Sequence, residues 1–309
     1  MRAAFLSTDL PFAPWAAALK RHFPELDLRC WPDVGDRAAV EAALVWAPPP
    51  GALAALPGLR LIHVLGAGVD HVLADPDRPA GVPLVRLVDP AMTAAMGEYV
   101  QFQALRLHLQ DLTYREQQGA RAWRAQPQVI ARQRRIGILG LGVLGSEAAL
   151  RLEVLGFDVA GWSRRGRRVR GISCHHGADG LAAIAARSEI LVCLLPLTPE
   201  TENILDAALF AAMPRGAAIV NCGRGAHLAE ADLLAALDSG QLSAAVLDVF
   251  RDEPLPPAHP FWRHPRVVVT PHVAAATNPD TAAPIVAAAL RRFAEGKRVA
   301  NLVVPARGY

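Results

Sequence analysis

Three short segments in the second half of the chain carry side chains suited to acid–base chemistry on a bound anion. Arg224 lies in NCGRG, Glu253 in LDVFRDEP and His272 in TPHVA. Each segment begins where an apolar, strand-like run ends, and the carboxyl ends of parallel strands meet at the ligand-binding edge of an open α/β sheet. We therefore expect the three side chains to converge there.

An arginine, a carboxylate and a histidine at one edge can reduce a 2-keto acid. The Arg224 guanidinium can hold the substrate carboxylate through two hydrogen bonds and polarise the carbonyl. His272 can donate a proton as hydride arrives, while Glu253 orients the ring and favours its protonated form. Taken alone, Arg224 would equally well be a surface salt bridge and His272 a core histidine. Behind a dinucleotide-binding motif, we interpret the three together as a catalytic set.

That motif is GLGVLG at residues 140–145, which follows an apolar run and precedes an alanine-rich amphipathic segment. In such a motif the first glycine allows a tight turn, the second a close backbone approach to a pyrophosphate, and the third close packing of the helix. The helix N-terminus adds N–H donors and partial positive charge. A purely structural turn is the alternative. The residues expected to bind the cofactor here are Gly140, Gly142, Val143, Leu144 and Gly145.

The strand that follows indicates which dinucleotide is bound. An NAD site normally has Asp or Glu after this strand to bind the ribose 2′-hydroxyl, whereas this chain has Ser163, Arg164 and Arg165. Guanidinium groups match phosphate geometry, so we expect these residues to bind a 2′-phosphate and the chain to prefer NADPH (NADP) over NADH. A solvated basic loop, continued by arginines at 167, 168 and 170, is the alternative.

Composition indicates a soluble globular protein, 52% hydrophobic and 20% charged, with a net charge of +3. This charge is small and dispersed, so no nucleic-acid partner is expected. No run approaches the ~18 apolar residues of a membrane span, and Asp9, Pro11 and Pro14 interrupt any signal peptide, so a cytoplasmic location is expected. The cysteines are scattered without a CxxC pair, and CHH at 174–176 has no second ligand cluster, so no metal site is expected.

Two domains are expected, because 309 residues exceed what one hydrophobic core usually supports. Two series of apolar runs alternate with helix-like segments, which is typical of parallel sheets flanked by helices. The expected strands are 2–7, 26–31, 42–46, 61–65 and 84–87 in the first series, and 135–139, 158–162, 190–194, 217–221, 245–249 and 267–270 in the second. Helices are expected at 15–22, 93–118, 146–155, 230–239 and 279–295.

The first series lacks a closing helix, so we assign the last helical segment back to it. The predicted domains are residues 1–99 with 278–309, which bind substrate, and residues 100–277, which bind the nucleotide. Two linker helices would connect them. The predicted fold class is α/β, with two Rossmann-like or flavodoxin-like doubly wound parallel sheets and the active site in the cleft between the domains.

These motifs resemble those of the D-isomer-specific 2-hydroxyacid dehydrogenase family, nearly from end to end. The matching segments are LGAGVD at 65–70, the glycine motif, WSR at 162–164, LPLTPET at 195–201, the three catalytic segments and the terminal ARGY. The resemblance implies substrate binding by Arg224, a carboxylate partner in Glu253 and a proton donor in His272. One departure is Ala229, where many relatives have Asp or Asn.

The resemblance also implies roles for residues outside the catalytic set. The N–H groups of Ala67, Gly68 and Val69 would bind the substrate carboxylate, and Trp46 would line a small pocket. The alternatives are a simple turn and a core tryptophan. Further cofactor contacts are implied for Leu195, Pro196, Thr201, Cys222, Gly223 and Asp248.

The implied activity is the NADPH-dependent reduction of glyoxylate and hydroxypyruvate to glycolate and D-glycerate. A homodimer is implied, with the nucleotide domain and its arms at the interface. One alternative is a D-2-hydroxyacid dehydrogenase that acts on another 2-keto acid, such as pyruvate or a branched or phenyl-substituted one. The other is a non-catalytic, nucleotide-sensing binding protein on the same fold, against which the retention of Arg224, Glu253 and His272 argues.

Overall fold

The structure is a computed structural model that describes residues 1–308. The chain divides into two compact units: unit 1 comprises Met1–Met92 and the residues from Thr277 onward, and unit 2 comprises Thr93–Ala276. The first boundary lies between Met92 and Thr93, inside helix α3 (Pro90–His108). The boundary expected after residue 99 lies in the same helix, and a continuous helix carries no break in its sequence pattern. Tyr309, which ends the ARGY segment, lies outside the described residues.

The two connections between the units differ in structure. The first is helical, because α3 runs through the boundary. The second lies in the loop before helix α9 (Pro279–Ala294), which belongs wholly to unit 1. The expectation of two linker helices was therefore wrong for the second connection.

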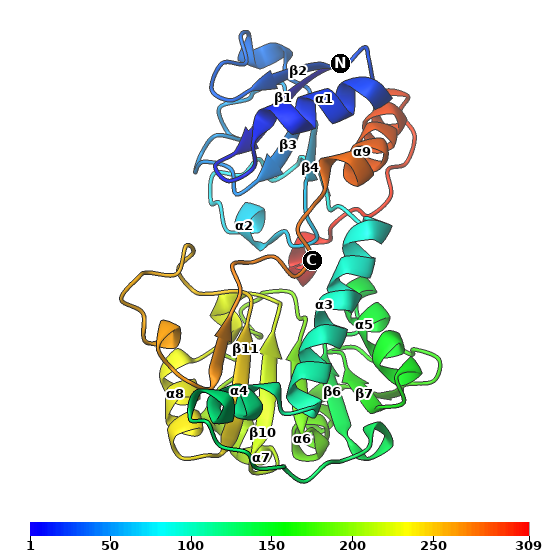
Figure 1. Cartoon of the computed structure of the whole chain (residues 1–309). Helices are drawn as coiled ribbons and strands as arrows, with labels where there is room; N and C mark the ends of the chain where they lie inside the picture. The colour runs from blue at the N-terminus through cyan, green and yellow to red at the C-terminus, as the bar shows by residue number, and fades with distance from the viewer. Residues whose placement is uncertain (309) are drawn as a thin grey trace. The chain divides into compact units, whose positions relative to one another are not determined.

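Unit 1 is built on a parallel sheet that has five strands within the described residues, in the order β2-β1-β3-β4-β5 (Figure 1). The strands are β1 (Arg2–Ser7), β2 (Asp27–Cys30), β3 (Ala42–Trp46), β4 (Leu61–Val64) and β5 (Leu84–Val85). The central strands are almost wholly buried. Parallel strands covered on both faces have no polar side, which is why they stand out as continuous apolar runs in the sequence.

Helices α1 (Phe12–His22) and α9 pack side by side against this sheet (Figure 1). Helix α9 begins where the Asn278 side chain accepts a hydrogen bond from Asp280 N, a strong helix-start signal. An ion pair between Arg21 and Asp280 joins the two helices. The buried face of α9 consists of Ala282, Ala283, Val286, Ala287 and Leu290. The short helix α2 (Asp70–Leu73) follows the LGAGVD segment.

Unit 2 contains a second parallel sheet, with seven strands in the described chain in the order β12-β11-β10-β9-β6-β7-β8. The strands are β6 (Arg135–Leu139), β7 (Asp158–Trp162), β8 (Ser173–His175), β9 (Ile190–Cys193), β10 (Ala217–Asn221), β11 (Leu242–Leu247) and β12 (Val267–Val269). The helices that accompany them are α5 (Val143–Val154), α6 (Gly177–Arg187), α7 (Ala207–Ala212) and α8 (Glu230–Asp238). Six strands are expected from the sequence, and the seventh, β8, is an edge strand with no buried residue and therefore no apolar run.

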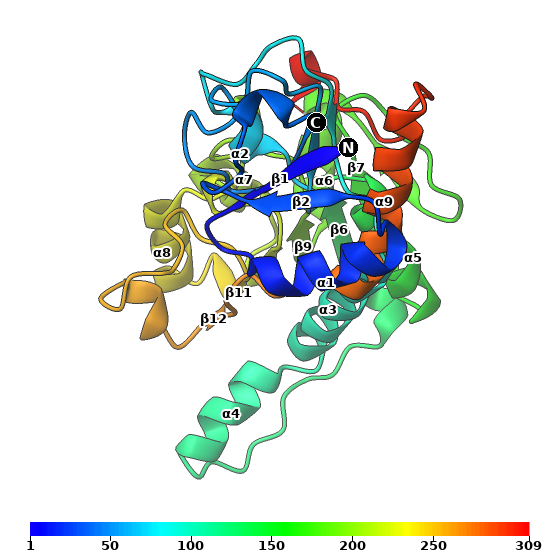
Figure 2. The same ribbon diagram turned by 90° about the horizontal axis from the view of Figure 1, so that it is seen from above.

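The long helix expected at 93–118 is two helices in the structure. Helix α3 ends at His108 and α4 (Asp111–Gly119) follows, because Gln110 adopts a left-handed conformation with φ of 59°. Figure 2 shows α4 and the returning chain extending away from the sheet of unit 2; we call residues 109–134 the arm. The return is fastened to α4 through the Tyr114 hydroxyl, which accepts hydrogen bonds from Gln126 N and Gln128 Nε2.

The two doubly wound parallel sheets confirm the fold class expected from the sequence. None of the helices between residues 1 and 308 combines the length and the hydropathy that a membrane span requires. The same residues contain no group of three or more His, Cys, Asp or Glu side chains that could hold a metal ion. The four cysteines are free thiols, of which Cys193 and Cys222 are buried.

Candidate active site

The predicted catalytic residues follow three adjacent parallel strands of unit 2. Arg224 comes after β10, Glu253 after β11 and His272 after β12. Gly225 lets the first two segments pass each other, because a Cβ at this residue would lie 1.8 Å from the carbonyl carbon of Phe250. The strand order thus brings together residues that lie far apart in the sequence.

His272 and Glu253 form a hydrogen-bonded pair. His272 Nδ1 lies 2.8 Å from Glu253 Oε2, and Phe250 N donates to the other carboxylate oxygen at 2.8 Å. Burial raises the pKa of Glu253, but the hydrogen bonds from His272 and Phe250 and the nearby positive charges of His272 and Arg224 outweigh it. The pKa of Glu253 therefore lies below its ordinary value. The carboxylate stays ionised and holds the imidazole in one orientation.

The main chain around Arg224 is held by neighbouring side chains. Asn221 Nδ2 donates to Arg224 O at 3.0 Å, and Arg224 N donates to His227 Nδ1 at 3.0 Å. The guanidinium contacts Gly223 O at 2.8 Å through Nη1. His227 and Asn221 are buried, so this loop is anchored in the core of unit 2 while the Arg224 side chain stays partly exposed.

The loop that carries His272 is fastened by a buried carboxylate. Asp248 is 1% exposed, and its two oxygens accept hydrogen bonds from Val273 N at 3.0 Å and Ala274 N at 2.9 Å. His272 N donates to Asp248 O at 2.8 Å. His272 itself has φ of 54°, in the left-handed region that residues with a side chain seldom adopt. The cofactor contact assigned to Asp248 stays a prediction, and in this structure both oxygens bond to the loop.

The glycine motif has the geometry of a pyrophosphate cradle. Gly140 has φ of 101°, and a Cβ there would lie 2.6 Å from Leu194 O. A Cβ on Gly145 would lie 1.8 Å from Gly140 O, whereas one on Gly142 would meet nothing within 4 Å. The first and third glycines therefore permit close packing, and the second leaves open space beside the N-terminus of α5, where Val143 and Leu144 begin the helix. These features fit a dinucleotide.

Ser163, Arg164 and Arg165 follow β7, next to the glycine motif. Ser163 Oγ accepts a hydrogen bond from Arg167 N at 2.9 Å. Arg164 Nη1 lies 3.2 Å from Glu200 Oε2, in an ion pair that the sequence did not indicate. A hydrogen bond with Thr198, and more weakly the Arg164 charge, lower the pKa of Glu200. A 2′-phosphate on Arg164 would therefore compete with a carboxylate.

The other predicted cofactor residues border the ends of β9 and β10. Thr201 Oγ1 accepts from Thr198 N at 2.9 Å and donates to Pro196 O at 2.8 Å, which closes the LPLTPET loop. Leu195, at the start of this loop, is buried, as are Cys222 and Gly223 after β10. The structure therefore gives Thr201 a role in the shape of the loop, and direct contact with a cofactor stays a prediction.

The predicted substrate residues Trp46, Ala67, Gly68 and Val69 lie in unit 1. The Trp46 ring covers the start of the LGAGVD loop, where a Cβ on Gly66 would lie 2.2 Å from Trp46 Cζ3. Thr277 Oγ1 donates to Leu65 O at 2.9 Å and holds the other side of this loop. The structure thus groups the predicted residues into two sets, one in each unit.

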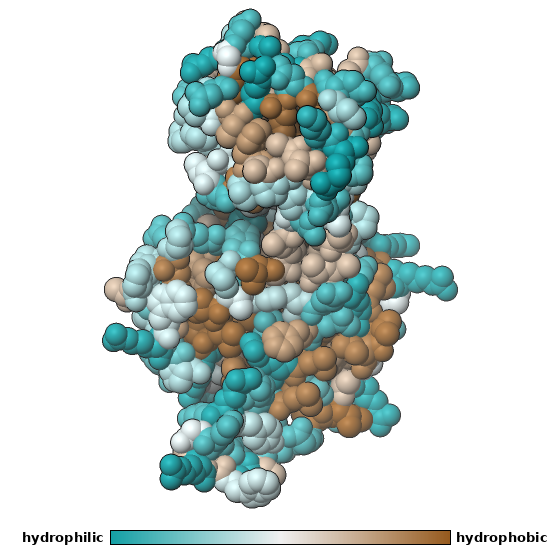
Figure 3. Space-filling view, turned by 45° about the horizontal axis from the view of Figure 1, so that its top comes forward, coloured by the Kyte–Doolittle hydropathy of each residue, from teal (hydrophilic) through white to brown (hydrophobic). Residues whose placement is uncertain are grey.

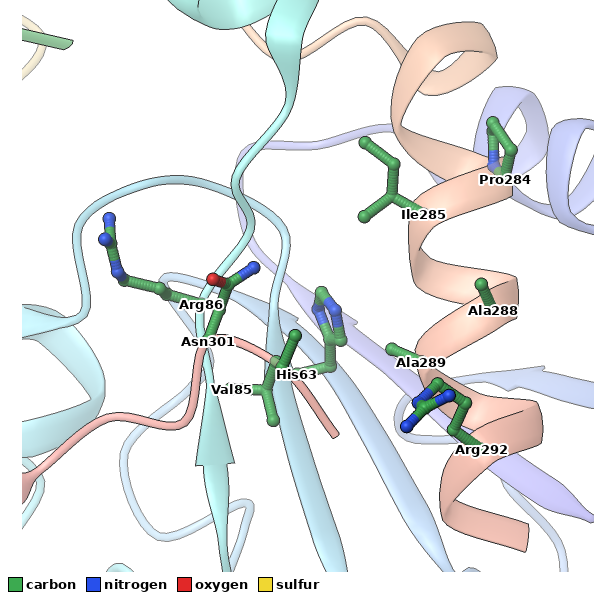
Figure 4. Close-up of a pocket in the computed structure, with 10 residues that line it drawn as sticks. His63, Val85, Arg86, Pro284, Ile285, Ala288, Ala289, Arg292 and Asn301 are labelled. Carbon is green, nitrogen blue, oxygen red and sulfur yellow. The ribbon is translucent and has the colours of Figure 1, made fainter. Parts of the chain in front are cut away.

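Unit 1 also contains a pocket of about 400 Å³ that includes none of the predicted site residues (Figure 4). It is lined by His63, Val85, Arg86, Pro284, Ile285, Ala288, Ala289, Arg292, Ala300 and Asn301. The His63 ring is 1% exposed, and its Nδ1 lies 2.9 Å from Val64 O, so Nδ1 carries a proton. Burial lowers the pKa of His63 to about 4, which keeps this ring neutral.

Two side chains missed by the sequence analysis contact the catalytic loop. Thr270 Oγ1 donates to Asp248 Oδ1 at 2.6 Å, and the Tyr99 hydroxyl lies 2.6 Å from Thr270 Oγ1. Thr270 stands two residues before His272 and could have been singled out as a polar neighbour. Tyr99 lies on α3, 171 residues away in the sequence, and no local pattern indicates the contact.

Known proteins with similar sequences cover nearly the whole chain. The family model "D-isomer specific 2-hydroxyacid dehydrogenase, NAD binding domain" matches residues 102–274. Glyoxylate/hydroxypyruvate reductase A of Serratia proteamaculans is 44% identical over 300 residues, which are 96% of each chain. The protein of the same name from Yersinia enterocolitica is 42% identical over 96% of each chain.

Solved structures of similar proteins match this chain along nearly its whole length. A D-isomer specific 2-hydroxyacid dehydrogenase from Xanthobacter autotrophicus Py2, in complex with NADPH and MES, has a TM-score of 0.95 at 43% identity and covers 100% of this chain and 99% of its own. An NADPH-dependent glyoxylate/hydroxypyruvate reductase from Sinorhizobium meliloti, in complex with NADP and sulfate, has a TM-score of 0.93 at 39% identity, with the same coverage. The match to the family model and the full-length relatives confirm the resemblance found in the sequence: the chain belongs to the D-isomer specific 2-hydroxyacid dehydrogenase family.

Proposed function

We propose that this chain catalyses the NADPH-dependent reduction of glyoxylate and hydroxypyruvate to glycolate and D-glycerate. The observation that carries the proposal is the pairing of His272 Nδ1 with Glu253 Oε2 at 2.8 Å. These two residues follow β12 and β11, and β11 in turn adjoins β10, which precedes Arg224. The full-length relatives named glyoxylate/hydroxypyruvate reductase A support these substrates.

NADPH, when bound, supplies the hydride that reaches the carbonyl carbon of the substrate. The glycine motif at 140–145 would hold the pyrophosphate, and Ser163, Arg164 and Arg165 would hold the 2′-phosphate. Further contacts would come from Leu195, Pro196, Thr201, Cys222, Gly223 and Asp248. The close Cβ distances at Gly140 and Gly145 support this fit, as do the NADPH and NADP bound by the two solved neighbours.

His272 is the proposed proton donor to the carbonyl oxygen. An ionised carboxylate only accepts hydrogen bonds, so His272 Nδ1 carries a proton toward Glu253, and the transferred proton leaves from Nε2. Glu253 stabilises the imidazolium before this transfer. In the reverse direction the neutral ring accepts a proton from the hydroxy acid.

Arg224 is the proposed anchor for the substrate carboxylate and polarises the carbonyl beside it. The N–H groups of Ala67, Gly68 and Val69 would add donors to the same carboxylate, and Trp46 would limit the size of the group that the pocket accepts. A small pocket would favour glyoxylate and hydroxypyruvate over keto acids with bulky side chains. The location of the site in a cleft between the domains stays a prediction.

The loss of NADPH absorbance tests the function directly. Glyoxylate, hydroxypyruvate, pyruvate, a branched keto acid and phenylpyruvate are each offered to the purified protein. The highest kcat/KM for glyoxylate or hydroxypyruvate would support the proposal. The highest value for one of the others would instead support a dehydrogenase for a different 2-keto acid. Binding of NADPH without turnover of any substrate would support a nucleotide-sensing protein.

We also propose a homodimer, located in the cytoplasm, in which α3, α5 and the arm form the interface. Large apolar side chains are exposed here: Trp123 by 104%, Val154 by 80%, Phe102 by 55%, Leu109 by 53% and Ile130 by 50%. Figure 3 shows apolar side chains gathered on the surface of unit 2. Extended apolar surfaces of this kind usually mark protein contacts.

Sedimentation equilibrium tests the assembly. The proposal expects twice the chain mass of 33.0 kDa, and expects substitution of Trp123 and Ile130 by serine to shift the protein toward the monomer. Trp262→Ser is the matched control, because Trp262 is 51% exposed but lies outside the arm. A wild-type protein that stays monomeric would refute the dimer.

A further inference from the structure

We infer that Tyr99 and Thr270 are positioning residues for His272, which act through Asp248 along one chain of hydrogen bonds. The inference rests on the proposed role of His272 as the proton donor. It assigns part of the catalytic geometry to helix α3, which lies outside every motif in the sequence. All four residues belong to unit 2.

The chain of hydrogen bonds runs in one direction. Tyr99 Oη lies 2.6 Å from Thr270 Oγ1, which in turn donates to Asp248 Oδ1 at 2.6 Å. A threonine hydroxyl has a single proton, and here that proton points to Asp248, so Tyr99 must donate to Thr270. Burial raises the pKa of the Tyr99 phenol, which therefore remains a donor.

The Asp248 carboxylate binds the Thr270 side chain before His272 and two backbone N–H groups after it. Its Oδ1 accepts from Thr270 Oγ1 and from Val273 N, and its Oδ2 accepts from Ala274 N at 2.9 Å. Rotation of this one carboxylate would break all three bonds. The hydroxyl of Thr270 is the only side-chain donor among these three, and Tyr99 fixes the direction in which its oxygen points.

His272 depends on this attachment because of its backbone conformation. A φ of 54° is unfavourable for a residue with a side chain and persists where the surroundings enforce it. Relaxation of the loop to a commoner conformation would move the imidazole away from Glu253, which holds it at 2.8 Å. Thr270 and Tyr99 therefore influence the proton donor without touching the substrate.

A merely structural role for the Thr270 hydroxyl is the competing explanation. The molecule offers a matched bond, since Thr281 Oγ1 donates to Asp89 Oδ2 at 2.6 Å in unit 1. Thr281→Val removes the same kind of hydroxyl–carboxylate bond away from the catalytic loop. Its effect on kcat measures what loss of stability alone does.

The first experiment compares Thr270→Val, Thr270→Ser and Thr281→Val in the full-length protein with NADPH and glyoxylate. Hydrogen bonds to charged groups contribute enough to predict that Thr270→Val lowers kcat roughly tenfold to hundredfold. The KM for NADPH should change far less than kcat, because the glycine motif and Ser163–Arg165 are untouched. Thr270→Ser should restore most of kcat, because it keeps the hydroxyl, and Thr281→Val should retain the wild-type kcat.

The second experiment is a double-mutant cycle with Tyr99→Phe. This change removes one neutral hydrogen bond and should lower kcat roughly twofold to tenfold. Because Tyr99 acts through Thr270, the double variant with Thr270→Val should be no slower than Thr270→Val alone. The inference would be overturned if the losses in kcat of the two single variants multiplied in the double variant. It would also be overturned if Thr270→Val kept the wild-type kcat, or if Thr270→Val and Thr270→Ser lost kcat equally. Every variant is compared with wild-type protein under the same conditions. Turnover by the wild type tests the proposed function, and the ratios of kcat between variants test this inference.

Discussion

His272 and Glu253 share a hydrogen bond of 2.8 Å between Nδ1 and Oε2, and the second oxygen of Glu253 accepts from Phe250 N at the same distance. The carboxylate is held at both oxygens, so it cannot rotate away from the ring without breaking a second bond. This arrangement fixes which ring nitrogen faces the carboxylate. It also makes the roles of the two side chains separable by substitution.

Replacement of His272 by asparagine should slow reduction of the keto acid by roughly 10²–10⁴-fold, which is the usual contribution of a positioned general acid. Binding of NADPH should persist, because the glycine motif and Ser163–Arg165 are unchanged. Steady-state kcat and NADPH fluorescence titration measure the two quantities. His264→Asn is the matched control in the same unit, and a His272→Asn enzyme that reduces glyoxylate at the wild-type rate would rule out this residue as the acid.

Replacement of Glu253 by glutamine should keep activity but alter its dependence on pH. The wild-type Glu253 has a lowered pKa, so the carboxylate stays ionised below its ordinary value of 4.5 and loses its charge only when the pH falls through that lowered pKa. Glutamine has no charge to stabilise the imidazolium. The change in rate that the wild type shows as the pH falls through the lowered pKa of Glu253 should therefore be absent from Glu253→Gln, which has no group to titrate there. Identical pH–rate profiles for the two proteins would contradict this account.

Neutral replacements of Arg164 and Arg165 should weaken NADPH binding at least tenfold and leave NADH binding nearly unchanged. Charge-assisted bonds to a 2′-phosphate contribute about 1.5–3 kcal/mol each, and NADH has no such phosphate. Glu200→Gln should strengthen NADPH binding, because it removes the carboxylate that pairs with Arg164 and would compete with the 2′-phosphate. Dissociation constants for both cofactors check the prediction, and a wild type that already prefers NADH would refute it.

The sequence predicted the layout of the fold well, for a physical reason. Strands buried on both faces are continuous apolar runs. Each expected strand is present, several with the expected bounds and the others with ends shifted by a few residues. Strand β8 was not predicted, because it lies at the sheet edge and has no buried side chain. The break between α3 and α4 was not predicted, because Gln110 adopts a left-handed conformation and no neighbouring glycine or proline indicates it.

The candidate site was predictable only where its residues stand in local motifs. Arg224, Glu253 and His272 follow adjacent strands, and that adjacency follows from the expected topology. The Tyr99–Thr270 contact and the Arg164–Glu200 pair depend on how distant segments pack, which no local spacing encodes. Asp248 was predictable in part. It stands in a motif that marks it as a site residue, but its hydrogen bonds to Val273 N and Ala274 N depend on the folded structure.

The last prediction concerns His63, whose buried ring makes the stability of unit 1 sensitive to acid. Burial lowers the pKa of His63 to about 4, whereas a histidine in the unfolded chain has a pKa of about 6.5. Between these two pH values the unfolded chain binds a proton at His63 that the folded chain does not bind. The stabilisation is therefore fully present above pH ~6.5 and is lost as the pH falls toward the folded pKa, with a total of about 3 kcal/mol.

His63→Met removes the titrating group and fills the same apolar position, so its free energy of unfolding should fall less steeply than that of the wild type between pH ~6.5 and ~4. Urea titrations at several pH values measure this slope for both proteins. His176→Met is the control, because His176 is exposed and its loss should leave the wild-type slope in place. Parallel curves for the wild type and His63→Met would show that the buried ring contributes nothing to the acid sensitivity, because no other titratable group differs between them.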